Sequence, residues 1–255
     1  MVKVRRISWL VIISVIINLT IFAPRIHARS GVTLVAHGIY TSGANGGTSG
    51  SQAIGTCDLL EIWVSYQDGA TVTLTDSNSD TFTRKTPPNQ AGGGDLALFY
   101  VKSPGATSVT FTLGGSGVFA SLAWKSWTGT LTSSDPYGTI NGASSGVSGS
   151  TDMQPGSISS SSGDLITTGN SPFTDTSNDT SINSGFTKTD GAGFIGSTSY
   201  PISVAYKIST GGSENPTWSI GASVTFNNAA IATFLQATGG VTPVTFFNNP
   251  ISGGS

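Results

Sequence analysis

Alternation of apolar and polar residues with a period of two is the feature that most restricts the fold of this 255-residue chain. It is clearest in residues 71–75, 108–113 and 223–226, which are rich in β-branched and aromatic residues and are bounded by Gly, Asn, Asp and Ser. This pattern is typical of β-strands joined by turns. After residue 28 the sequence has no amphipathic helical pattern of useful length. The sequence therefore predicts an all-β protein.

Four further runs are apolar almost without interruption: residues 59–64, 96–101, 118–124 and 229–235. Strands that are buried on both faces have this composition, so we expect these runs to form central strands. About a dozen short strands, separated by turn residues, predict an antiparallel β-sandwich over residues 29–237. Residues 41–55, 144–149 and 157–163 are rich in small polar residues and predict loops, and residues 170–184 predict a long exposed excursion.

The first 28 residues have the pattern of a signal peptide. Lys3, Arg5 and Arg6 precede an apolar run over residues 7–23, and Ala28 supplies a small residue at the exit. We expect cleavage there and secretion to the extracellular space or the cell surface. The alternative is a retained transmembrane anchor, because the apolar run approaches the length of the shortest membrane spans.

The C-terminal residues 238–255 predict a flexible tail that contains two prolines and ends in Gly-Gly-Ser. Residues 244–247 (Val-Thr-Phe-Phe) form a short β-prone segment within it. Such a segment can add to an exposed sheet edge, so self-association through the tail is one predicted contact.

Charge argues against two classes of partner. Removal of residues 1–28 takes four of the 11 basic residues and none of the 13 acidic ones, which changes the net charge from −2 to −6. No cluster of Lys and Arg remains to neutralise phosphates. We therefore expect no nucleic-acid partner, and no anionic membrane surface once the leader is removed.

Cys57 is the only cysteine, so the chain forms no intrachain disulfide. A lone cysteine in a secreted protein can be a reactive thiol or an intermolecular bridge. The more ordinary interpretation is a small buried residue beside Leu59 and Leu60, because no His or Lys is close in sequence to lower the pKa of the thiol.

Several segments together resemble a known kind of module. They are residues 73–83 and 106–113, Trp127-Thr128-Gly129, residues 163–166 (Gly-Asp-Leu-Ile) and 185–187 (Gly-Phe-Thr), and residues 229–234. In this order they resemble the widespread secreted bacterial β-sandwich modules that are jelly-roll and lectin-like, many of which have no assigned function. The resemblance implies a jelly-roll-like sandwich over most of residues 31–237 and leaves the function open, since a fold does not specify one.

Asp76, Asn78 and Asp80 are the candidate metal ligands. Their alternate spacing brings oxygens together as in acidic calcium loops, so a structural Ca²⁺ ion is the only cofactor that the sequence suggests. The alternative is a hairpin turn, where Asp, Asn and Ser bond to their own backbone. A second set, Asp175, Asn178 and Asp179, is no more specific.

The sequence predicts no catalytic centre. His37 is the only histidine after the leader and lies within a predicted strand, and the chain has no G-x-S-x-G motif. Glu61 and Asp58 are three residues apart, so they point to opposite faces of a strand and do not form the carboxylate pair of a glycosidase.

Aromatic side chains offer a better route to binding, because sugars stack on such rings. The candidate ligand-binding residues are Trp127, Trp218 and Tyr137. Trp124 and Trp127 must point to opposite faces of one strand, so we expect one in the core and the other outside or under a loop. The alternative is that these rings only fill the core.

The sequence as a whole predicts a secreted, non-catalytic structural or surface-interaction module. The second hypothesis is a carbohydrate-binding module that uses exposed aromatic residues, with polysaccharides or other cell-surface components as partners. A glycosidase is a distant third.

Overall fold

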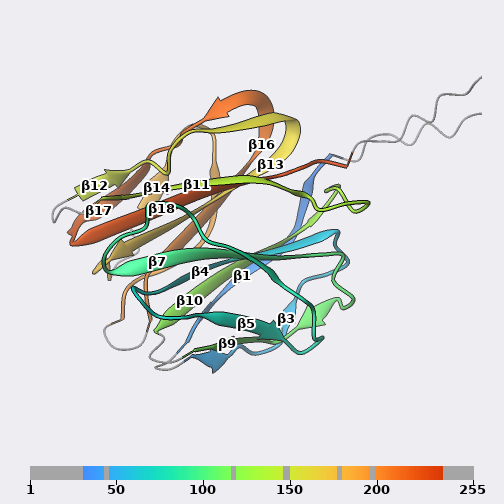
Figure 1. The fold of residues 1–255 in the computed structure, drawn as a ribbon, viewed down its shortest axis with the longest axis horizontal. Coiled ribbons are helices and arrows are strands. Elements are labelled where there is room, and N and C mark those ends of the chain that lie inside the picture. The colour runs from blue at the N-terminus through green and yellow to red at the C-terminus, as the bar shows by residue number, and fades with distance from the viewer. Residues whose placement is uncertain are drawn as a thin grey trace, which may run out of the picture. The chain divides into compact units, whose positions relative to one another are not determined.

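The computed structural model describes residues 31–42, 46–115, 119–145, 150–176, 180–195 and 199–237. These residues form eighteen strands and no helix, and all strand pairs are antiparallel (Figure 1). The predicted all-β, antiparallel class is confirmed. There are more strands than the dozen expected, because many strands have only two to four residues, including two within the predicted loop over residues 41–55. The predicted signal peptide (1–28) and tail (238–255) lie outside the described residues.

The first half of the fold contains ten strands. Five of them form a broad sheet in the order β1-β10-β4-β7-β6, and the others form two small sheets in the orders β2-β9-β5 and β3-β8. The bounds are β1 (Thr33–Thr41), β2 (Gly47–Thr48), β3 (Gln52–Ala53), β4 (Leu59–Gln67), β5 (Thr73–Asp76), β6 (Thr83–Lys85), β7 (Gly94–Lys102), β8 (Ser108–Val109), β9 (Phe111–Gly114) and β10 (Ala120–Thr128).

The second half contains eight strands. Five form a second broad sheet in the order β11-β18-β13-β16-β15, and three form a small sheet in the order β12-β17-β14. The bounds are β11 (Tyr137–Ser145), β12 (Ser150–Met153), β13 (Ile158–Phe173), β14 (Thr180–Ile182), β15 (Thr187–Ala192), β16 (Ile202–Glu214), β17 (Trp218–Val224) and β18 (Phe226–Phe234).

The two halves have the same topology. Strands β1, β10, β4, β7 and β6 correspond in order to β11, β18, β13, β16 and β15, and β2-β9-β5 corresponds to β12-β17-β14. The register is also the same: Leu59 pairs with Lys102 in one half, and Leu165 pairs with Ile208 in the other. Even the irregularity in the first strand recurs, after Leu34 in β1 and after Tyr137 in β11. The chain is therefore an internal structural duplication.

Three hydrophobic clusters divide the described residues into layers. The first lies between the first broad sheet and its small sheets, the second between the two broad sheets, and the third between the second broad sheet and β12-β17-β14. Figure 1 shows the first half in blue to green and the second in yellow-green to red. Strands β4 and β10 are buried at every position but the last, which confirms that the continuous apolar runs form central strands.

Equivalent residues of the two halves meet where the broad sheets pack together. Thr167 Oγ1 lies 2.9 Å from Glu61 Oε1, and Ser65 Oγ lies 2.7 Å from Ser171 Oγ. Between them the Trp63 ring covers Gly169, where a Cβ atom would lie 3.0 Å from Trp63 Cε3. An approximate two-fold axis between β4 and β13 produces this pairing.

The predicted exposed excursion over residues 170–184 is wrong, as is the loop over residues 157–163. Strand β13 runs through residues 158–173, and Asn170 and Ser171 are fully buried. Asn170 Nδ2 donates to Asn227 Oδ1 at 2.6 Å. Polar side chains can be buried when they find hydrogen-bond partners, and those partners are distant in sequence.

Candidate functional site

The expectation that Trp127 and Trp218 present exposed rings is wrong. Both are fully buried, Trp127 between the two broad sheets and Trp218 under the second one, where its Nε1 donates to Thr168 Oγ1 at 3.0 Å. Trp124 and Trp127 do lie on opposite faces of β10, as their spacing predicts. Both faces of that strand are covered, so neither ring reaches solvent.

Tyr137 is half-buried, and its ring is already in contact with neighbours. The ring stacks on Tyr100 with the centroids 5.8 Å apart, and the edge of Phe234 lies against it. Lys85 Nζ lies 4.2 Å from the Tyr137 centroid. Burial, together with the negative charge of Asp135, raises the pKa of the Tyr137 hydroxyl. Tyr137 packs against the cluster that contains Trp127, whereas Trp218 lies in another cluster, so the three predicted residues share no exposed surface.

The acidic segment Asp76, Asn78 and Asp80 forms the turn that follows β5. Asp76 Oδ1 accepts hydrogen bonds from the backbone N–H groups of Asn78 (3.1 Å) and Asp80 (2.9 Å), and Asn78 Nδ2 donates to Asp80 Oδ1 (3.0 Å). These are the bonds of a side chain that closes its own turn. Burial, with a contribution from the neighbouring Asp80, raises the pKa of Asp76.

No group of three His, Cys, Asp or Glu side chains among the described residues could hold a metal ion. Asp175 is buried beside the end of β13, while Asn178 and Asp179 of the second acidic set lie outside the described residues. Calcium binding at Asp76, Asn78 and Asp80 stays a prediction.

His37 and Cys57 both contact other parts of the fold. His37 lies on the edge strand β1, and its Nδ1 is 2.9 Å from Asp190 Oδ2 on β15 of the other half. Cys57 is buried in the first hydrophobic cluster, which confirms the more ordinary interpretation. Burial, and then the charge of Asp58, raises the pKa of the Cys57 thiol to about 11.

A buried ion pair lies between the two broad sheets and was not predicted. Lys125 Nζ is 2.9 Å from Glu61 Oε1, and both side chains are fully buried. The two residues are cross-strand neighbours on β10 and β4. Thr167 of the second half donates to the same carboxylate oxygen and accepts a hydrogen bond from Trp63 Nε1 at 3.1 Å. The pair joins two strands of the first half in a closed interior, and the Thr167 hydrogen bond connects it to the second half.

A cluster of aromatic side chains at one end of the second broad sheet was also missed. Phe173 packs against Phe194, Tyr200 and Phe226, with centroids 5.1, 5.4 and 6.4 Å away. The end of the loop before β7 and the first residue of that strand cross these rings through residues 92–94, all glycine. A Cβ on Gly93 would lie 2.8 Å from Phe173. The Gly triplet was the available signal, because a run of glycines often marks a close backbone approach.

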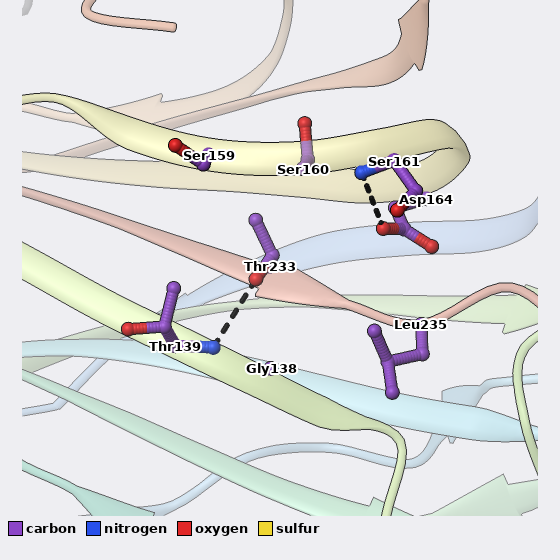
Figure 2. Close-up of a pocket in the computed structure, with 8 residues that line it drawn as sticks. All are labelled: Gly138, Thr139, Ser159, Ser160, Ser161, Asp164, Thr233 and Leu235. Carbon is purple, nitrogen blue, oxygen red and sulfur yellow. Dashed lines mark hydrogen bonds between the residues drawn. The ribbon is translucent and has the colours of Figure 1, made fainter. Parts of the chain in front are cut away.

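One shallow pocket lies in the second half, between β11, the first part of β13 and the end of β18 (Figure 2). Its volume is about 390 Å³, and it is lined by Gly138, Thr139, Ser159, Ser160, Ser161, Asp164, Thr233 and Leu235. Thr139 N donates to Thr233 Oγ1 at 3.1 Å, and Ser161 N donates to Asp164 Oδ2 at 2.8 Å. It is the candidate binding site, and it contains none of the residues predicted from the sequence.

Comparisons with protein-family models, with curated proteins and with solved structures found no match to this chain. The class of protein is therefore defined by its structure alone: a duplicated, layered, antiparallel β-sandwich. In the described residues no helix is long and apolar enough to cross a membrane.

Proposed function

We propose that this protein is a secreted, non-catalytic structural or surface-interaction module. The observation that carries the proposal is that the side chains best suited to binding or catalysis are buried in the cores of the protein. All four described tryptophans are buried in the cores, and the only fully buried ion pair among the described residues joins strands within the sandwich.

The surroundings of the remaining candidates support a non-catalytic role. Asp164 is the only carboxylate that lines the pocket, whereas glycosidases use two. His37 is engaged with Asp190. Neither arrangement pairs a base with a nucleophile.

Carbohydrate binding through exposed aromatic rings is the second hypothesis, and the burial of Trp127 and Trp218 removes its main support. A sugar contact cannot use these two rings, and the hydroxyl-lined pocket offers other groups for it.

Two measurements test this proposal. Fractionation of the producing cells should find the protein in the medium or on the outer cell surface. The purified protein should bind isolated cell envelopes equally well in Ca²⁺ and in EDTA. Incubation with envelope polysaccharides should release no reducing ends. Cytoplasmic retention would contradict the proposal, and so would steady release of sugar. Loss of retention in EDTA would instead support the predicted calcium site.

A further inference from the structure

The pocket in the second half corresponds to a position that the first half has filled. Two equivalent hydrogen bonds locate that position. Thr139 N bonds to Thr233 Oγ1 at 3.1 Å, just as Ala36 N bonds to Ser126 Oγ at 3.1 Å. Asp164 Oδ1 accepts from the backbone after β18, at Gln236, just as Asp58 Oδ2 accepts from the backbone after β10, at Gly129.

Ile54 lies at the equivalent of Ser160, since each lies four residues before the aspartate that both halves share, Asp58 or Asp164. The Ile54 side chain is fully buried in the first cluster, and its carbonyl accepts a hydrogen bond from Ser126 Oγ at 2.6 Å. Ser160 has no such bulk, and its hydroxyl lies 2.7 Å from that of Ser209. The same framework is therefore packed in one half and open in the other.

The open position has the chemistry of a polar, uncharged ligand. The hydroxyls of Thr139, Ser159 and Ser161 lie at exposed positions around it and can donate or accept. Asp164 is only 6% exposed, and each of its oxygens accepts one backbone hydrogen bond, which leaves lone pairs for further donors. Leu235 adds an apolar wall.

These groups select among ligand classes. The eight lining residues include no Lys, Arg or His, so nothing there neutralises an anion. A polyhydroxyl compound can donate to Asp164, exchange hydrogen bonds with the surrounding hydroxyls and lay its C–H groups on Leu235. A volume of about 390 Å³ falls in the range of small-molecule sites.

We propose that this pocket binds a neutral sugar unit of a polysaccharide or glycan. The inference rests on the proposed surface-interaction function and names its partner class. It differs from the aromatic hypothesis, because recognition runs through hydroxyls and one carboxylate.

The test uses the residue that the first half itself carries. Ser160→Ile places the side chain of Ile54 in the second half and should fill the pocket. The matched control is Ser213→Ile, because Ser213 is exposed, pairs with Ser159 across the same hairpin and does not line the pocket. Retention of the full chain is measured on cellulose, xylan, mannan and chitin, and dissociation constants are measured with the matching oligosaccharides.

We expect the unaltered chain and Ser213→Ile to be retained on at least one of these polysaccharides, and Ser160→Ile to bind at least tenfold more weakly. Thr139→Val, which keeps the shape and removes one hydroxyl, should weaken binding about fivefold, as for one lost hydrogen bond. It also serves if Ser160→Ile fails to fold.

Two results would overturn the inference. Unchanged affinity in both pocket variants would place sugar binding elsewhere, and absence of retention on the whole panel would exclude the ligand class. Neither result touches the proposed function, whose own test is the location of the chain and its retention on envelopes.

Discussion

The two halves of the molecule share a backbone plan and differ in the side chains placed on it. At the interface between the broad sheets the first half supplies Trp63 and Lys125, and the second half supplies Gly169 and, at the equivalent of Lys125, Ala232. On the outer face the relation is also unequal, with Ile54 filling one half where Ser160 leaves the other open.

This difference allows the two broad sheets to pack closely against each other. Two identical faces related by a two-fold axis would press equal residues against each other, so large residues would collide and small ones would leave voids. Large residues in one half opposite small ones in the other give close packing. The first half carries most of the bulk, and the second half keeps the open surface.

The largest expected effect comes from breaking the Glu61–Lys125 pair, which only the first half has. Lys125→Met should lower the free energy of unfolding by about 3–5 kcal/mol, because it leaves a buried carboxylate without its counter-charge. The double variant Glu61→Leu/Lys125→Met should recover most of that loss. Urea denaturation measures both. A double variant no more stable than the single one would show that the loss comes from packing.

The next effect concerns the Cys57 thiol, which only the first half has, since the equivalent position in the second half is Gly163. The thiol pKa is raised from 9.0 to about 11 in the fold, so the folded state holds its proton more tightly than the unfolded state. Stability from this group is complete below about pH 9 and is lost as the pH rises towards 11, by about 2–3 kcal/mol.

Denaturation midpoints at pH 8, 9, 10 and 11 test this expectation against Cys57→Ala. The variant should lose less stability over that interval, because it retains the tyrosines and lysines that also titrate there. Parallel curves for the two proteins would contradict the assigned role of the thiol.

Some of this architecture could be predicted and some could not. The alternation in residues 71–75 and 108–113 predicts strands, because burial of one face requires it. The spacing of Trp124 and Trp127 predicts opposite faces. It contains nothing about a further sheet that covers the second face, so the exposure expected for Trp127 was wrong.

The duplication was invisible for a related reason. Asp58 and Asp164, Phe82 and Phe186, and Tyr100 and Tyr206 are identical pairs, but they are scattered among positions that differ. Trp63 packs on its equivalent Gly169, so these two residues must differ in size. Such differences lower the sequence similarity of the two halves where they meet. The pocket depends on Ser160 lying where Ile54 lies, which only the superposed topology reveals.

Gly169 tests the packing between the halves at its tightest point. Gly169→Ala should cost about 1–3 kcal/mol, because the new Cβ would lie 3.0 Å from the buried Trp63 ring. Gly50→Ala is the matched control, since a Cβ there meets nothing within 4 Å. Thermal or urea unfolding compares the two. Equal stabilities would show that the sheets can separate at this point without cost.

The smallest expected effect concerns the aspartate that both halves have, Asp58 in the first and Asp164 in the second. Asp58 accepts a hydrogen bond from Gly129 N at 2.6 Å, and Asp164 accepts one from Gln236 N at 3.1 Å and another from Ser161 N. Asp58 connects the residue after β10 to the start of β4, and Asp164 connects the chain after β18 to the interior of β13. Asp58→Ala and Asp164→Ala should each lower the free energy of unfolding by about 1–2 kcal/mol, because backbone donors lose their partner.

The double variant should show the sum of the two losses, since the aspartates lie in separate halves. Urea denaturation of the three variants measures this. If only one of the two single variants were less stable than the unaltered protein, the aspartate would share its position in both halves but not its stabilising role.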